Sequence, residues 1–165
     1  MNSNFGYIGR VTLKTICNGK VTSTDYYNSG TADLFRGYAM AMAGQDITNW
    51  LPSYIDVGLI NTSTKEFTSV LRNHGGVSVV RTFIEDTDGP CTRITATLTN
   101  DMLYNNVGEG TMQFRLMSPT DKNILAELNL TESASATLKE TLENIPNGTQ
   151  LIILWDLCVK NQGGT

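Results

Sequence analysis

The sequence predicts an all-β fold: a two-sheet, jelly-roll-like sandwich of eight or nine strands, with one α-helix inserted near residues 31–43. Segments that alternate apolar and polar residues recur at a spacing of about ten residues, which is typical of sandwiches. Turn-forming residues separate these segments. The chain also holds 22 Thr and 15 Asn, and Thr favours strands whereas Asn favours turns.

The first element is a β-hairpin over residues 7–27. Val11 and Leu13 share one face of its first strand. Asn18-Gly19 follows, and this pair is a strong hairpin signal because both central positions of a type I′ turn need positive φ.

A helix comes next, because Gly30 interrupts the strand pattern, Thr31 can cap a helix and Gly44 can end one. Its apolar residues fall within one arc at helical spacing: Leu34, Phe35, Tyr38, Ala41 and Met42. The other side is also poor in charge, with Gly37, Ala39, Met40 and Ala43. We therefore expect this helix to be covered on both sides, by its own sheet and by a loop or a neighbouring subunit.

Further strands are predicted at 55–60, 67–71, 77–85, 93–99, 112–117, 124–130 and 151–159. The last is apolar on both faces, so we expect it to be central and buried between layers. Residues 131–147 fit either a helical turn or a short edge strand through Leu138, Leu142 and Ile145. The whole chain, 1–165, is expected to form a single domain with flexible ends at about 1–6 and 161–165.

Composition argues against several classes of function. The formal net charge is −4, which disfavours binding to nucleic acid through its phosphates. No apolar run approaches the roughly 20 residues of a membrane span. The first twenty residues show no secretory signal.

The three cysteines, Cys17, Cys91 and Cys158, are far apart and form no Cys-x-x-Cys pair, so a zinc or redox site is disfavoured. Cys158 lies in an apolar stretch and is expected to be buried. A reduced protein assembled inside the cell fits this pattern better, and one disulfide with one free thiol remains open.

No motif predicts catalysis, a cofactor or a metal. The single histidine, His74, stands in a His-Gly-Gly turn without a nucleophile elbow. The acidic turn 85–89 lacks the further ligands of a calcium loop, and Gly108-Glu109-Gly110 lacks the third glycine of a dinucleotide site. We therefore expect a protein that is not an enzyme.

Tyr26, Tyr27, Trp50 and Tyr54 allow two interpretations. They are ordinary core and interface material, or they form a platform that stacks on sugar rings. The first predicts packing or subunit contact, and the second predicts glycan binding.

The order of parts carries a resemblance. The hairpin leads to the helix Leu34-Phe35…Tyr38-Ala39-Met40-Ala41, the segment Pro52-Ser53-Tyr54-Ile55-Asp56-Val57-Gly58 follows, and the chain closes with Leu151-Ile152-Ile153-Leu154-Trp155-Asp156-Leu157. This layout resembles the small β-sandwich virion proteins of tailed bacteriophages, which decorate the head or form the base of head and tail fibres. The resemblance implies a structural role in multiple copies on a capsid or tail, assembled in the bacterial cytoplasm.

The expected partners are therefore other virion proteins, such as the major capsid or tail proteins, and further copies of the chain as a homo-oligomer. Nucleic acid and membranes are not expected. The residues predicted to make these contacts belong to the helix and the loop after it: Phe35, Tyr38, Met40, Trp50 and Tyr54. The alternative is a carbohydrate-binding or receptor-binding module in which Trp50 and Tyr54 stack on a host glycan.

Overall fold

The N-terminal hairpin forms as the Asn18-Gly19 pair predicts. Strands β1 (Phe5–Cys17) and β2 (Lys20–Gly30) pair antiparallel. The two turn residues have positive φ, 50° at Asn18 and 78° at Gly19. Asn and Gly tolerate this left-handed backbone better than other residues, so the tight turn costs little here.

The computed structural model describes residues 5–73, 76–87, 89–103, 108–119, 123–143 and 148–161. These residues form ten strands, two α-helices and two short 3-10 helices. After the hairpin come α1 (Ala32–Met42), η1 (Thr48–Trp50), β3 (Tyr54–Ile60), β4 (Phe67–Ser69), β5 (Val77–Ser78), β6 (Val80–Asp86), β7 (Gly89–Thr99), η2 (Asn100–Met102), β8 (Thr111–Met117), β9 (Ile124–Asn129), α2 (Glu132–Glu143) and β10 (Gln150–Asn161).

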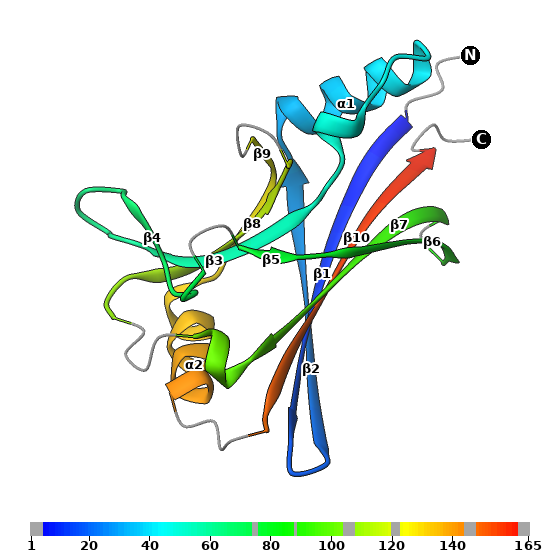
Figure 1. Ribbon diagram of the computed structural model, residues 1–165. Coiled ribbons are helices and arrows are strands. Elements are labelled where there is room, and N and C mark those ends of the chain that lie inside the picture. The colour runs from blue at the N-terminus through cyan, green and yellow to red at the C-terminus, as the bar shows by residue number, and fades with distance from the viewer. Residues whose placement is uncertain are drawn as a thin grey trace.

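The strands form two antiparallel sheets, which confirms the two-sheet sandwich (Figure 1). Sheet A has the order β2-β1-β10-β7-β6, and sheet B has the order β4-β3-β8-β9. The two sheets are joined at two places. The end of β2 pairs with β9 through Ser29 and Gly30, while β5 pairs with β3 and the chain continues directly into β6 of sheet A.

The core lies between the facing sides of the two sheets. Alternate residues of each strand point inward, and the largest of them are fully buried. Sheet A contributes Val11, Ile94, Ile153 and Trp155, and sheet B contributes Ile55, Phe114, Leu116 and Leu125. In β10 the inward series is Leu151, Ile153, Trp155 and Leu157.

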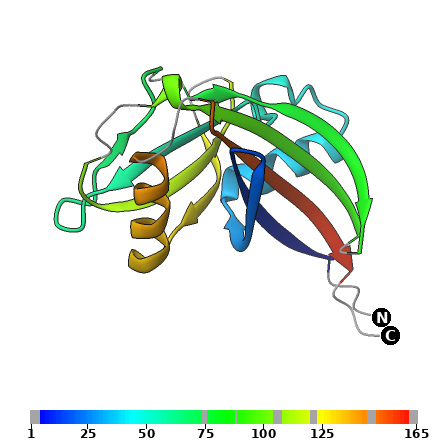
Figure 2. The same ribbon diagram turned by 90° about the horizontal axis from the view of Figure 1, so that it is seen from below.

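The helices lie at opposite ends of the sandwich, α1 beside β9 and α2 beside β8 (Figures 1 and 2). Residues 132–143 are helical, which decides between the two structures that the sequence left open. Leu142 is buried and Leu138 packs against the core, while the hydroxyl of Ser135 accepts a hydrogen bond from the backbone N–H of Met112 at 2.8 Å. Ile145 lies outside the described residues.

Several strand predictions need correction. The predicted strand 77–85 is broken at Val79, because its first part joins sheet B and the rest joins sheet A. β10 is central as predicted, but Ile152 and Leu154 on its outer face are only half-buried, so it does not lie between two layers. At the inner limits of the predicted flexible ends, Phe5 of β1 and Asn161 of β10 pair with each other.

The three cysteines are not all reduced, contrary to the favoured expectation. Cys91 and Cys158 form a disulfide, and Cys17 is a free thiol. The reason is register: Cys91 in β7 lies directly opposite Cys158 in β10, a relation that the spacing along the sequence does not reveal. Both residues are buried, as expected for Cys158.

No helix in the described parts of the chain combines the length and the apolar character that crossing a membrane requires.

Candidate functional site

α1 packs closely against the η1 segment that follows it, and Gly37 makes this close packing possible. Leu34 and Gly37 are its buried positions. A Cβ added at Gly37 would lie 3.3 Å from the Cβ of Trp50, so the absence of a side chain lets η1 pack closely on the helix. The predicted apolar arc is therefore buried only at Leu34, and its other members are exposed: Phe35, Tyr38, Ala41 and Met42.

A groove of about 200 Å³ runs between α1, the η1 segment and the inner face of sheet A. We call it the α1 groove. Its lining is Leu34, Gly37, Tyr38, Ala41, Ile47, Trp50, Leu51, Pro52, Arg81, Thr92 and Leu157. The guanidinium of Arg36 lies 5.6 Å from the centre of the Trp50 ring, a cation–π contact that holds the indole in place. Arg81 closes the sheet side by donating to the carbonyl of Pro52 at 2.7 Å.

A second face of α1 stays open to solvent. Phe35, Ala39, Met42 and Ala43 stand at positions i, i+4, i+7 and i+8, which lie on one side of a helix, and all four are exposed. We call this set the outer stripe. Among the aromatic contacts of the described residues, Phe35 has one partner. The ring of Tyr7 packs edge-on against the Phe35 ring, with the ring centres 5.9 Å apart. The sequence predicts a helix covered on both sides. Among the described residues, the chain itself covers one side of α1, and the side that carries the outer stripe is open.

The predicted contact residues fall into three places. Tyr38 and Trp50 meet in the α1 groove, and burial raises the pKa of Tyr38 above its ordinary value. Phe35 belongs to the outer stripe, and Met40 is half-buried. Tyr54 lies elsewhere, in a separate hollow.

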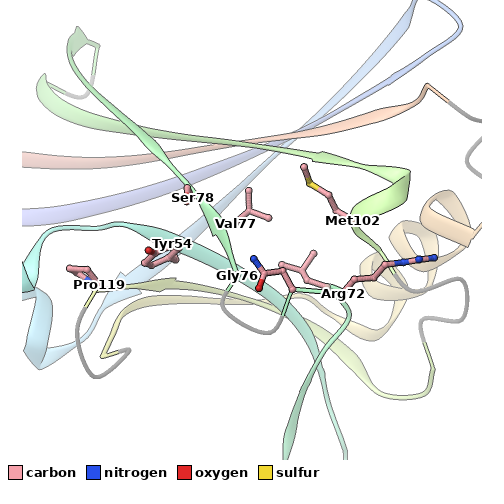
Figure 3. A pocket seen from close by; sticks show the side chains of 9 residues that line it. Tyr54, Arg72, Gly76, Val77, Ser78, Met102 and Pro119 are labelled. Atoms are coloured by element: carbon pink, nitrogen blue, oxygen red, sulfur yellow. The ribbon is translucent and has the colours of Figure 1, made fainter.

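That second hollow has a volume of about 530 Å³ and a mixed polar and apolar lining. Figure 3 shows Tyr54 and Pro119 on one side of it and Met102 on the other. The Arg72 side chain extends away from Tyr54, because its Nε donates to the carbonyl of Leu103 at 2.8 Å.

The four aromatics considered as a sugar platform do not come together. Trp50 and Tyr54 line different hollows. Tyr26 and Tyr27 are neighbours in β2, so their side chains point to opposite faces of sheet A. Tyr26 packs against the core, whereas Tyr27 is exposed.

A buried polar cluster lies beside Gly9 on the inner face of sheet A. Burial raises the pKa of Tyr7 well above its ordinary value, and Tyr38 raises it further, while Asn28 and Trp155 act in the opposite direction. Tyr7 is therefore uncharged at neutral pH. Within the described residues, its hydroxyl and the indole nitrogen of Trp155 are buried without a hydrogen bond of good geometry.

Gly9 is the residue that makes room for this cluster. A Cβ there would lie 2.1 Å from Oδ1 of Asn28 and 2.7 Å from the hydroxyl of Tyr7. We expect Gly9→Ala to displace both side chains and lower the free energy of unfolding by about 1–3 kcal/mol, measured by urea denaturation. Gly19→Ala is not a suitable control because Gly19 has positive φ. Ser23 in the neighbouring strand is exposed. Ser23→Ala is therefore the control, and it should change the free energy of unfolding by less than about 0.5 kcal/mol.

On the outer face of sheet A, three charged residues stand in one row across three strands. Asp156 of β10 lies opposite Arg10 of β1 and Arg93 of β7. Its carboxylate accepts from Arg10 at 2.8 Å and from Nε and Nη2 of Arg93 at 2.8 and 2.9 Å. Burial raises the pKa of Asp156, but the hydrogen bonds from Arg93 and Arg10 outweigh burial and hold the pKa below its ordinary value.

Sequence reasoning missed one exposed residue beside the α1 groove. Phe83 is 69% exposed, shares the inner face with Arg81, and lies opposite Thr92 of the groove lining. The sequence of 77–85 predicted a strand but not that this strand is an edge.

Two of the motifs set aside in the sequence contain residues that the structure does not describe. His74 lies outside the described residues, and so does Asp88 of the acidic turn. In the parts of the chain that the structure describes, no three His, Cys, Asp or Glu side chains are grouped to hold a metal ion. Comparison of the chain with protein-family models, with curated proteins and with solved structures gives no match.

Proposed function

We propose that this chain is a non-enzymatic structural protein of a virion, bound in multiple copies to a phage capsid or tail through surface complementarity. The observation that carries the proposal is the outer stripe of α1. Its four residues are apolar and exposed. The most exposed of its large side chains is Met42, at 90%. Exposed apolar residues that share one face of a helix favour a contact with another protein.

The rigid setting of the outer stripe supports the same function. The cation–π contact between Arg36 and Trp50 and the close approach of Gly37 fix α1 against η1. On its other flank, the hydroxyl of Thr31 donates to the carbonyl of Ile124 at 2.6 Å, so this N-cap residue ties α1 to β9 instead of capping the helix. A surface held in one shape before binding loses little entropy when it docks.

The virion role itself is tested by quantitative mass spectrometry of purified phage particles. We expect the protein in many copies, at a fixed ratio to the major shell protein. The ratio would separate a head decoration from a tail or vertex component. Absence from purified particles would overturn the virion proposal.

The outer stripe makes a sharper prediction. Ala39→Glu and Ala43→Glu should reduce particle attachment at least tenfold, since burying an unpaired carboxylate costs more than about 1.4 kcal/mol. Folding should be unaffected, because both positions are exposed. The readout is copy number per particle, with thermal unfolding of the free protein measured alongside.

The matched control is Ala136→Glu, the same substitution at an exposed position of α2. It should leave attachment unchanged. Wild-type attachment of both α1 variants would show that the outer stripe is not the contact surface.

Carbohydrate binding is the weaker candidate. It requires Trp50 and Tyr54 to stack on one glycan, and the two residues line separate hollows.

A further inference from the structure

β6 is an edge strand with one open side. It pairs with β7 along its whole length, from Val80 to Asp86. No strand pairs with its other side among the residues that the structure describes. The neighbouring segment on that side makes its last backbone contact before β6 begins, where the N–H of Val79 donates to the carbonyl of Ser53 at 3.2 Å. Figures 1 and 2 show β6 at the border of sheet A.

This edge lacks most of the usual protection against pairing and has only charged side chains. Exposed edges are commonly shielded by charged residues, especially Lys, by Pro, by a bulge or by very short length. β6 has seven residues, VRTFIED, without Lys or Pro, and its pairing with β7 shows no register shift. The edge of sheet B is different, since β4 has only three residues. Phe83 and Val80 on β6 are 69% and 67% exposed.

The sequence of β6 is complementary to itself when two copies run antiparallel. With Phe83 opposite Phe83, each Arg81 faces the Glu85 of the other copy. The three residues alternate along the strand, so they share one face, and both Arg81 and Glu85 are exposed. Nη1 of Arg81 donates to the carbonyl of Pro52 in its own chain, which leaves its other N–H groups to donate to Glu85 of the second copy. One register therefore gives two opposite-charge cross-strand pairs around an aromatic pair, each a favourable combination.

The neighbouring registers do not have this property. Side chains alternate between the two faces of a strand, so shifting one copy by a single residue would exchange the faces. The neighbouring registers that keep the faces are therefore shifted by two residues. A slide in one direction centres the pair on Thr82 and sets Arg81 opposite Phe83. A slide in the other direction centres it on Ile84 and sets Glu85 opposite Phe83. Charge complementarity thus selects the register centred on Phe83.

We propose that two copies of this chain join through antiparallel pairing of their β6 edges, centred on Phe83, so that sheet A continues across the dimer. The contact is isologous, since the same strand is used by both copies, and it closes under two-fold symmetry. This inference deepens the proposed structural function by naming the surface that joins copies. It leaves the outer stripe of α1 available to a different partner.

Cysteine cross-linking tests the register directly. Opposed residues of an antiparallel pair have Cα atoms about 4.5–5.5 Å apart, which is disulfide range. In a Cys17→Ser background, Phe83→Cys should form a covalent dimer under mild oxidation, detected on a non-reducing gel. Val80→Cys is the matched control on the same strand with nearly equal exposure. In this register the two Val80 positions lie about 20 Å apart, so the control should stay monomeric.

A charge exchange tests the pairing without a covalent bond. Glu85→Lys should raise the dimer dissociation constant at least tenfold by setting like charges opposite each other, measured by sedimentation equilibrium. Adding Arg81→Glu in the same chain should restore association to within about threefold of wild type. Glu66→Lys, an equal charge change at an exposed site before β4, should have no effect.

Three results would overturn the inference. They are a monomeric wild-type protein at its highest soluble concentration, equal cross-linking of the Phe83→Cys and Val80→Cys proteins, or no response to Glu85→Lys. None of these measurements uses particles. Loss of the dimer with normal copy number on particles would thus remove this inference alone, while a dimer absent from particles would remove the virion role alone.

Discussion

Asp156→Asn is expected to lower the free energy of unfolding by about 3–5 kcal/mol, the usual cost of breaking a buried ion pair from one side. The wild-type carboxylate is fully buried and accepts hydrogen bonds from Arg10 and Arg93. The amide has nearly the same shape but no charge. Two guanidinium groups, whose side chains are only 16% and 33% exposed, would then lose the negative charge that lies between them.

Urea denaturation of the two proteins measures this difference. Asp33→Asn is the matched control, because Asp33 is only loosely paired with Arg36 at 3.9 Å on the surface of α1. Such exposed pairs contribute less than about 1 kcal/mol. A loss at Asp156 as small as that at Asp33 would show that the row contributes little to stability.

The same residue predicts a dependence on acid. The pKa of Asp156 is lower in the folded chain than in the unfolded chain, where an aspartate has a pKa of about 3.9. Its contribution is therefore fully present above about pH 4, and it is lost as the pH falls through the folded pKa, because the unfolded chain binds the proton first. The difference in stability between wild type and Asp156→Asn should shrink in that range and stay constant between pH 5 and 8.

The sequence predicted most strands because strand formation here is local. Asn18-Gly19 dictates its own turn geometry, and the alternation in the second half of β7 matches its burial. The break at Val79 was missed, although the alternation of apolar and polar residues lapses there, because Val79 and Val80 are adjacent apolar residues. The sequence alone does not reveal that this lapse marks the divergence of the two sheets, which sends β5 to β3 and β6 to β7.

The buried face of α1 illustrates a second limit. Hydrophobicity predicts that Phe35 and Met42 face the core, but both are exposed. Packing depended instead on the smallest residue, Gly37, which admits Trp50. A periodicity argument weighs residues by their apolar character and cannot see the shape of the partner segment.

Part of the candidate site could be predicted and part could not. The sequence pointed to α1 and the following loop, and Tyr38 and Trp50 do meet in the α1 groove. It grouped Tyr54 with them because the three are near in sequence, although β3 carries Tyr54 away to a different hollow. Phe83 was missed because an edge strand is defined by its lack of a neighbour, which is a property of the whole sheet.

Removal of the Cys91–Cys158 disulfide is the other change with a large expected effect. The double variant Cys91→Ala/Cys158→Ala should lose about 4 kcal/mol of unfolding free energy, because the bond closes a loop of 67 residues and so restricts the unfolded chain. Paired alanines leave no buried thiol behind, and the strands β7 and β10 keep their hydrogen-bonded register. Cys17→Ala, at the free and partly exposed thiol, is the control and should cost less than about 1 kcal/mol.

Thiol counting decides whether the bond is present before any stability is compared. In urea without reductant, a maleimide label should modify Cys17 alone, and all three cysteines should react once reductant is added. In the native protein the disulfide should resist brief treatment with reductant, because both cysteines are buried and exchange needs access to the sulfur atoms. Three labelled thiols in urea alone would restore the reduced protein that the sequence favoured, and the loss of stability in the double variant would then have to come from packing at two buried positions.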